Sequence, residues 1–161
     1  MNLIVAVDNK YGIGKNNDLL CKLKNDMNFF KETTKNKIVV MGRKTCNSIP
    51  NMPLKNRENI VITRSKEKEE NGIKYFNKLP EKYLNDDNVF IIGGSQIYEL
   101  YKDYINIAYV TYIEKDFNAD TFLSNSLINL LENSKKEELY SYEENNIKYK
   151  IFKCEIINAK K

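Results

Sequence analysis

Short runs of hydrophobic residues, separated by helical or polar stretches, divide this chain into regular segments. The apolar run at 3–7 is unbroken, which is typical of a strand covered on both faces in a parallel sheet. The predicted strands are 3–7, 37–41, 59–63, 73–76, 88–92 and 106–113. The predicted helices are 25–35, a short helix from Gly42 to near Pro50, 79–84 and 95–101. Strands therefore alternate with helices along most of the chain.

One segment near the N-terminus follows neither a helical nor a strand pattern. Residues 8–24 contain Gly12, Gly14 and three asparagines, so we predict a long loop there. Long loops inside a compact domain are usually functional. Asn25 follows this loop and is expected to cap the next helix.

The end of the chain has a different pattern. Polar and apolar residues alternate at 137–142 and 148–157, and Glu-Glu-Asn-Asn at 143–146 joins the two runs. This arrangement predicts an antiparallel hairpin. The chain as a whole is predicted to form one α/β domain over residues 1–161. Its central β-sheet is mainly parallel, with an antiparallel C-terminal hairpin and helices on both faces.

Length and composition exclude several classes of protein. The chain has 161 residues, enough for one domain, and 42% of them are hydrophobic and 30% charged. It contains no apolar run of membrane-spanning length and begins without the features of a signal peptide. We therefore expect a soluble cytoplasmic protein that binds no membrane. The net charge of +4 is modest and the charged stretches mix both signs, so no nucleic-acid partner is expected. Nothing marks a large interface, and a monomer is expected.

The cysteines do not indicate a metal site. Cys21, Cys46 and Cys154 are an odd number without short paired spacing, which argues against a metal and against a disulfide framework. Buried thiols in a reducing compartment are expected instead.

Proton chemistry in this chain must proceed without histidine, because the sequence contains none. A carboxylate, a lysine, a tyrosine, a thiol or water must then serve. Helical spacing places Asp26 on the same face as Phe29, Phe30 and Thr33. A carboxylate on an apolar helix face costs stability unless it is paired or used. Asp26 is therefore the best-placed candidate.

Three strand ends carry residue types that bind phosphate. Residues 42–45 combine a helix N-terminus with two cations and a hydroxyl. Residues 93–97 begin with two glycines, which let a ligand approach the backbone. Residues 63–65 supply the hydroxyls and the cation that suit the 2′-phosphate of NADP. Taken alone, the first junction is explained equally well by a glycine turn followed by exposed basic residues. The double glycine of the second is weak evidence by itself, because glycines also permit a tight turn. The third, by itself, is better explained as an exposed loop arginine.

The position of these junctions is more informative than any one of them. The chain has neither a P-loop nor a Gly-x-Gly-x-x-Gly fingerprint, so a standard Rossmann site is not expected. In open α/β sheets, ligands bind beyond the carboxyl ends of the strands. All three junctions follow predicted strands, and together they indicate a nucleotide site.

These features occur in an order that closely resembles bacterial dihydrofolate reductase. The matching segments are Ala6, 12–20, Asp26 with Phe30, 41–45, Pro53 and Leu54 with Arg57, 92–94 with Tyr98, and 120–122. Each motif is weak alone, but the ordered set is highly specific. The resemblance implies reduction of 7,8-dihydrofolate to tetrahydrofolate by hydride transfer from NADPH, in support of one-carbon metabolism and thymidylate synthesis. Antifolate inhibitors are implied as further ligands.

The resemblance also assigns roles to individual residues. It implies that Asp26, Thr111 and Leu19 are the catalytic residues, with Thr111 hydrogen-bonded to the Asp26 carboxylate. Asp26 would orient the pterin and assist its protonation, the proton itself arriving through water. The implied substrate-binding residues are Val5, Ala6, Met27, Phe30, Ile49, Leu54, Arg57, Ile92 and Tyr98. The implied cofactor-binding residues are Ala6, Ile13, Gly14, Gly42, Arg43, Lys44, Thr45, Thr63, Arg64, Ser65, Gly93, Gly94, Ser95, Gln96 and Ile97.

Two of these implications are specific enough to test. Arg57 is expected to pair with the α-carboxylate of the glutamate tail of the substrate. Gly93 and Gly94 are expected to be joined by a non-proline cis peptide, which is otherwise very rare.

Two positions depart from the family's pattern. Cys21 stands where many bacterial relatives have a tryptophan that helps to anchor a water, and Lys24 stands where a proline is common. A thiol is smaller and a weaker donor, so we expect a roomier site with reduced antifolate sensitivity.

Two other functions remain as alternatives. An NADPH reductase of similar fold that acts on a pyrimidine intermediate of riboflavin synthesis would share the phosphate junctions. It would not need Asp26 or Arg57 at these places. A nucleotide-binding module without catalysis would need neither Asp26 nor Thr111.

Overall fold

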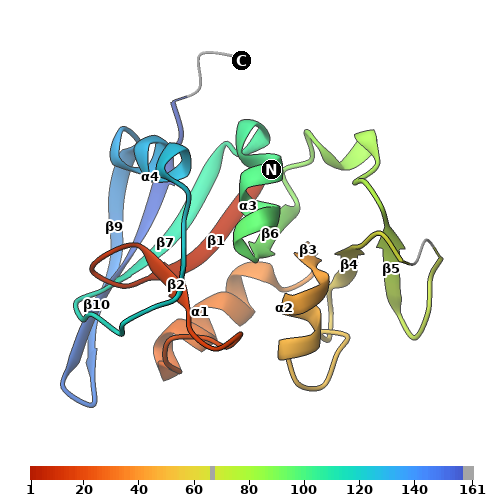
Figure 1. Cartoon of the computed structure of the whole chain (residues 1–161). Helices are drawn as coiled ribbons and strands as arrows, with labels where there is room; N and C mark the ends of the chain where they lie inside the picture. The colour runs from red at the N-terminus through yellow and green to blue at the C-terminus, as the bar shows by residue number, and fades with distance from the viewer. Residues whose placement is uncertain (66–67, 158–161) are drawn as a thin grey trace.

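The computed structural model describes residues 1–65 and 68–157 (Figure 1). Their centre is an eight-stranded sheet in the order β5-β4-β3-β6-β1-β7-β10-β9. The strands of this sheet are β1 (Asn2–Val7), β3 (Ile38–Gly42), β4 (Glu58–Ile62), β5 (Ile73–Phe76), β6 (Val89–Gly93), β7 (Ile107–Ile113), β9 (Lys135–Glu144) and β10 (Ile147–Glu155). The domain expected over 1–161 also includes residues 66–67 and 158–161, which lie outside the described residues.

The strand directions confirm the predicted mainly parallel sheet. Every neighbouring pair from β5 to β7 is parallel. β10 runs antiparallel to β7 and to β9, so the C-terminal hairpin forms one edge of the sheet (Figure 1). Asn145 and Asn146 make the turn between β9 and β10 with φ angles of 52° and 66°. A two-residue turn with two positive φ angles suits the twist of a hairpin, and asparagine tolerates this conformation.

Helices cover both faces of the sheet, as the alternation of side chains within each strand requires. The helices are α1 (Lys24–Thr34), α2 (Arg43–Ser48), α3 (Ser95–Tyr101) and α4 (Asn125–Glu132). Leu3 of β1 packs in one hydrophobic cluster together with Tyr98 of α3 and Leu127 of α4. Ile4, its neighbour, belongs to a second cluster against which Phe29 of α1 packs. Consecutive residues of one central strand thus contribute to two cores.

Three elements differ from the pattern-based prediction. Residues 8–24 are not entirely loop, because β2 (Gly12–Gly14) pairs with β8 (Thr121–Phe122) in a small second sheet. The helix predicted at 79–84 is only a 3₁₀ turn, η1 (Glu81–Tyr83). A second 3₁₀ turn, η2 (Lys102–Tyr104), extends α3.

Helix α4 was not predicted. Ser124 caps it, its side chain accepting a hydrogen bond from the Leu127 N–H at 3.2 Å. Leu127 and Leu131 are almost completely buried. A capping serine followed by leucines four residues apart is a local helix signal, which the pattern-based prediction missed.

The prediction that Asn25 caps α1 is wrong. The N-cap residue is Leu23, whose side chain cannot accept a hydrogen bond. The backbone N–H groups of Lys24 and Asn25 donate instead to the two carboxylate oxygens of Glu144, at 2.8 Å and 3.0 Å. A side chain distant in sequence therefore replaces the local cap.

Candidate active site

The three predicted phosphate junctions lie side by side. β3 lies between β4 and β6 in the sheet. In the register, Gly42 pairs with Ile62 of β4, and Met41 pairs with Gly93 of β6. The carboxyl ends of the three strands are therefore level, and the residues that follow them gather at one edge. This arrangement was predicted from the strand ends alone.

The first two junctions are in contact through glycines. The Gly93–Gly94 peptide is cis, as predicted, and Gly93 has a φ of 130° that favours glycine. A Cβ built on either glycine would lie 3.5 Å from the Thr45 hydroxyl of α2. A Cβ on Gly42 would lie 3.0 Å from the side chain of Ile97 in α3. The glycines thus let α2 and α3 begin close together.

Two arginines at the carboxyl edge of the sheet differ in their surroundings. The guanidinium carbon of Arg43 lies 5.5 Å from the ring centroid of Tyr75 in β5. Arg64 is exposed, between Thr63 and Ser65, whose hydroxyls are 3.1 Å apart. The remaining predicted cofactor residues at these strand ends are Lys44 and Gln96, which are exposed, and Ser95, which is half-buried. The chain thus offers cations and hydroxyls at the ends of β3, β4 and β6, which fits a phosphorylated nucleotide.

Asp26 lies on the first turn of α1 and is hydrogen-bonded to β7. The Thr111 hydroxyl donates to Oδ1 of Asp26 at 2.5 Å, and Thr111 is 3% exposed. Burial raises the pKa of Asp26 above its ordinary value. The Thr111 hydrogen bond lowers this pKa, and the negative charge of Glu144 raises it. A desolvated carboxyl group with a raised pKa, held by one hydrogen-bond donor, is a candidate functional residue.

The Asp26–Thr111 pair lies at the same edge of the sheet as the phosphate junctions. Thr111 pairs in register with Ala6, near the carboxyl ends of β7 and β1. β1 in turn neighbours β6, which ends at Gly93. The pair and the glycines are therefore separated by one strand.

The predicted pocket walls are only partly buried. Phe30, Ile49, Leu54 and Ile92 pack at the margin of the second hydrophobic cluster. The exposed fraction is 51% for Met27 and 62% for Leu19. Val5 is almost buried in β1, and Ile13 and Gly14 lie half-buried in β2.

Arg57 is fixed beside this apolar margin. One guanidinium nitrogen donates to the Thr34 hydroxyl at 3.0 Å, and Nε donates to the Lys55 carbonyl at 2.9 Å. Its guanidinium carbon lies 5.8 Å from the ring centroid of Phe30, and burial lowers its pKa. A partly desolvated guanidinium held in one orientation suits a carboxylate ligand.

Tyr98, a predicted substrate-binding residue, lies in α3 beside Gly93. It is 4% exposed, and its hydroxyl donates to the Ile4 carbonyl at 2.9 Å. Burial raises its pKa. Its hydroxyl is therefore committed to β1, and a Cβ built on Gly93 would lie 3.4 Å from it.

The segment before α1 brings Cys21 close to Asp26. Cys21 is half-buried and packs against the cluster of Leu23, Ile113 and Tyr149. Burial raises the pKa of its thiol, and the nearby Asp26 carboxylate raises it further. At neutral pH the thiol is therefore protonated and a weak hydrogen-bond donor.

The loop at 8–24 is attached to the rest of the chain by two aspartates. The Asp8 carboxylate accepts hydrogen bonds from the N–H groups of Gly12, at 2.8 Å, and Phe117, at 3.2 Å. The Asp120 carboxylate accepts from the Asn16 N–H at 2.9 Å. Leu19, near the end of this loop, is exposed.

Glu144 and its partner Tyr149 were not recognised as site residues. They lie on the C-terminal hairpin, yet the Glu144 carboxylate reaches the start of α1 and the Tyr149 hydroxyl donates to it. In the sequence, Glu144 stands in a polar turn, and no local pattern indicates its contact with residues more than a hundred positions away.

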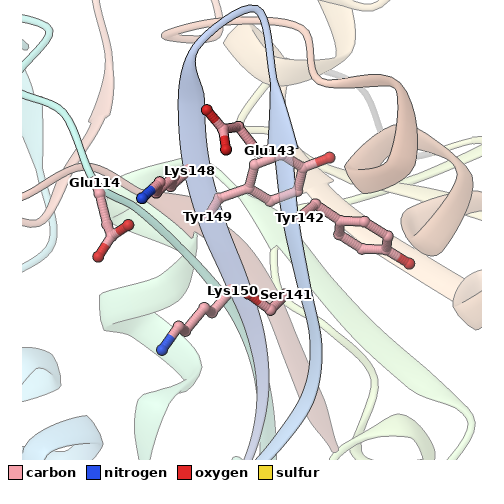
Figure 2. A pocket seen from close by; sticks show the side chains of 7 residues that line it. All are labelled: Glu114, Ser141, Tyr142, Glu143, Lys148, Tyr149 and Lys150. Atoms are coloured by element: carbon pink, nitrogen blue, oxygen red, sulfur yellow. The ribbon is translucent and has the colours of Figure 1, made fainter.

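A separate hollow of about 460 Å³ lies at this hairpin. Figure 2 shows Glu114, Lys148 and Lys150 on one side of the hairpin and the rings of Tyr142 and Tyr149 on the other. None of the predicted site residues lines this hollow. Within residues 1–65 and 68–157, no group of three or more His, Cys, Asp or Glu could hold a metal ion. No helix in the same ranges is long and apolar enough to span a membrane.

Comparison with known proteins identifies the same family throughout. Residues 1–155 match the family model described as dihydrofolate reductase. The chain is 37% identical over 125 residues to the dihydrofolate reductase of Staphylococcus haemolyticus, an alignment that covers 76% of this chain and 75% of that protein. It is 37% identical over 123 residues to that of Bacillus subtilis (strain 168), with 74% and 73% covered. For the enzyme of Sus scrofa the identity is 38% over 147 residues, with 76% and 77% covered.

Proposed function

Because the chain belongs to the dihydrofolate reductase family and is therefore an oxidoreductase, we propose that it transfers hydride from NADPH to 7,8-dihydrofolate and releases 5,6,7,8-tetrahydrofolate. The family reduces dihydrofolate and uses a nicotinamide cofactor. The proposal includes NADPH as the cofactor, the roles given to individual residues and a place in one-carbon metabolism.

One observation carries this proposal: the hydrogen bond between Asp26 and the buried Thr111, one strand away from the Gly93–Gly94 junction. The Asp26 carboxylate has a second oxygen, and two carboxylate oxygens can accept a fork of N–H bonds from the amidine-like edge of a pterin. Such bidentate contact fixes the orientation of the ring. Orientation matters because hydride transfer requires the donor and acceptor carbons to be close and aligned.

The phosphate junctions are the proposed cofactor site. NADPH supplies the hydride from its nicotinamide ring, and the chain supplies binding and orientation. Thr45 and the glycines at 93–94 would hold the phosphates, because the Thr45 hydroxyl lies beside both glycines at the start of α2 and α3. Thr63, Arg64 and Ser65 would bind the 2′-phosphate, because they combine two hydroxyls with an exposed guanidinium.

Arg57 is the proposed partner of the substrate's glutamate tail. Its guanidinium is held against Phe30 and Thr34 at the margin of the apolar wall. A guanidinium in a fixed orientation recognises a carboxylate through two parallel hydrogen bonds.

Asp26 would assist protonation of the pterin without being its direct proton donor. The reduced ring gains a hydride at the acceptor carbon and a proton at the neighbouring nitrogen. The negative Asp26 carboxylate favours the protonated pterin electrostatically, and water delivers the proton. Cys21 is the nearby group that distinguishes this chain from many relatives, and its thiol would hold such a water weakly.

The alternatives have less support. A reductase that acts on a pyrimidine intermediate would not need the Asp26–Thr111 pair or the fixed Arg57. A nucleotide-binding module without catalysis would gain nothing from a desolvated carboxyl group, which costs stability. The presence of both features favours the reduction of dihydrofolate, and antifolate inhibitors would then compete for the same carboxylate.

The decisive assay follows the absorbance of NADPH with and without dihydrofolate, for the wild-type protein and for Asp26→Asn. Asparagine keeps the shape but loses the charge and one acceptor. We expect dihydrofolate-dependent oxidation that falls at least about a hundredfold in this variant. Asp87→Asn is the matched control, because Asp87 is exposed and lies before the amino end of β6. Absence of oxidation in the wild type would refute the proposed reaction, and full activity of Asp26→Asn would refute the role of Asp26.

A further inference from the structure

The first turn of α1 depends on a side chain from the far end of the chain. The first N–H groups of any helix have no partner within the helix. In α1 the N-cap residue is Leu23, which offers no side-chain acceptor. The N–H of Lys24 donates to Oε1 of Glu144 at 2.8 Å, and the N–H of Asn25 donates to Oε2 at 3.0 Å. Both oxygens of one carboxylate thus bind adjacent peptide groups.

Glu144 is itself held in place by the hairpin. It is the last residue of β9, paired with Ile147 across the turn. The hydroxyl of Tyr149 also donates to its carboxylate. Tyr149 is completely buried and packs with Leu23. The carboxylate therefore bridges a buried ring of β10 and the N-terminus of α1.

Glu144 is expected to be charged at neutral pH. The hydrogen bond from Tyr149 lowers its pKa most, and the N–H groups of Asn25 and Lys24 lower it further. A negative charge at a helix N-terminus also interacts favourably with the helix dipole. The contact is therefore that of an ionised carboxylate with three donors.

The residue that follows the two capped N–H groups is Asp26. A change in the position of Lys24 or Asn25 moves Asp26 relative to Thr111, because all three α1 residues belong to one helical turn. On the side of β7, Thr111 fixes one oxygen of Asp26. On the side of the hairpin, the two hydrogen bonds to Glu144 hold the backbone that carries Asp26.

We propose that Glu144 is a positioning residue for the active site: from the tip of the C-terminal hairpin, it fixes the first turn of α1 and thereby the place of the Asp26 carboxylate. This role of Glu144 depends on the proposed role of Asp26 in binding the pterin. It gives the β9–β10 hairpin, which contributes no predicted ligand contact, a part in substrate recognition.

The electrostatic environment of Asp26 gives this role a distinct signature. The charge of Glu144 on β9 acts on Asp26, and the charge of Asp26 in turn raises the pKa of Tyr149 on β10 and of Cys21 before the helix. On α1 itself, Lys24 and Lys31 are exposed. The charge of Glu144 raises the pKa of Asp26. Neutralising Glu144 should therefore lower this pKa, whereas neutralising a carboxylate that does not act on Asp26 should leave it unchanged.

The test compares Glu144→Gln with Glu143→Gln. Glutamine keeps the length of the side chain but offers one acceptor and a donor in place of two acceptors. Glu143 is a matched control, because it is the adjacent residue of β9, is exposed, and pairs in register with Lys148 (Figure 2). Three quantities are measured: hydrogen exchange at the Lys24 and Asn25 amides, the pKa of Asp26 by carboxyl-carbon NMR, and steady-state kinetics.

For Glu144→Gln, we expect exchange at both amides to accelerate roughly tenfold, as for loss of a helix cap. The pKa of Asp26 should fall. The kcat/KM for dihydrofolate should fall about tenfold, whereas the KM for NADPH should not change. Glu143→Gln should leave all of these quantities unchanged. If Glu144→Gln does not fold, Glu144→Asp, which keeps the charge but has a shorter reach, should show the same acceleration of exchange.

Unchanged exchange at both amides would overturn the proposal. So would faster exchange with an unchanged Asp26 pKa and unchanged kinetics for dihydrofolate, since Glu144 would then be only a structural cap. If the wild-type protein does not oxidise NADPH with dihydrofolate, the proposed function fails. The amide exchange at Lys24 and Asn25 then still decides whether Glu144 fixes the first turn of α1.

Discussion

Replacing Thr111 with valine removes the hydroxyl that donates to Asp26 and keeps nearly the same side-chain shape. Thr111 is 3% exposed, so water cannot easily replace the lost donor. The distance of 2.5 Å between its oxygen and Oδ1 of Asp26 is typical of a hydroxyl bound to an ionised carboxylate. Hydrogen bonds to charged groups contribute about 1.5–3 kcal/mol, and we expect Thr111→Val to destabilise the folded protein by about this amount at neutral pH.

The effect should depend on pH, and its sign follows from the protonation of Asp26. The Thr111 bond favours the charged carboxylate and so lowers the pKa of Asp26, while burial raises it more strongly. Because the net pKa of Asp26 in the folded state is raised, its contribution to stability is present in acid, below the unfolded pKa. That contribution is lost as the pH rises through the folded pKa. Without the Thr111 hydroxyl the folded-state pKa of Asp26 rises further, and the loss of folding stability at high pH becomes larger. Thr111→Val should therefore be destabilised most above the folded pKa of Asp26. In acid only a neutral hydrogen bond is lost, about 0.5–1.5 kcal/mol.

Urea unfolding at acid and neutral pH measures this difference, with Thr111→Ser as the matched control. Serine keeps the hydroxyl and loses one methyl group, which costs about 0.8 kcal/mol at either pH. The KM for dihydrofolate at neutral pH should rise in Thr111→Val and stay close to wild type in Thr111→Ser. Equal destabilisation of the two variants at both pH values would show that the hydroxyl does not stabilise the Asp26 carboxylate. A loss of folding stability in Thr111→Val that is larger in acid than at neutral pH would contradict the same role of the hydroxyl.

Three further substitutions test other parts of the site. Cys21→Trp should increase antifolate affinity and the rate of hydride transfer severalfold, because an indole is a better hydrogen-bond donor and fills the space beside Asp26. No change in either quantity would mean that Cys21 limits neither inhibitor binding nor hydride transfer. Arg64→Ala should raise the KM for NADPH roughly tenfold and leave the KM for NADH unchanged, whereas an equal effect on both cofactors would rule out a contact with the 2′-phosphate. Arg57→Lys should raise the KM for dihydrofolate roughly tenfold but not the KM for a dihydropterin without the glutamate tail, and a similar loss with both substrates would contradict the proposed pairing.

Elements whose pattern is local could be predicted from the sequence. The unbroken run of β1 predicted a strand buried on both faces, and Leu3 and Ile4 do contribute to opposite cores. The glycines and cations after β3 and β6 predicted a shared edge, because the carboxyl ends of parallel strands lie together. The cis peptide between Gly93 and Gly94 was accessible only through the family resemblance.

Features that depend on distant contacts could not be predicted in this way. Asn25 has the properties of a helix cap, but Glu144 occupies that role from 119 positions away. Tyr98 lies in the predicted region, yet no local pattern indicates that its hydroxyl donates to the Ile4 carbonyl. Helix α4 has both a cap and a leucine pair, so its omission reflects a missed local signal.

Hydride transfer from the nicotinamide ring to dihydrofolate can be followed atom by atom. The most direct measurement uses NADPH that carries deuterium at the hydride-donating position and examines the product by mass spectrometry and NMR. We expect one deuterium on the acceptor carbon of tetrahydrofolate for each NADPH oxidised. Oxidation of NADPH without a labelled tetrahydrofolate, or no dihydrofolate-dependent oxidation at all, would contradict the proposed reaction.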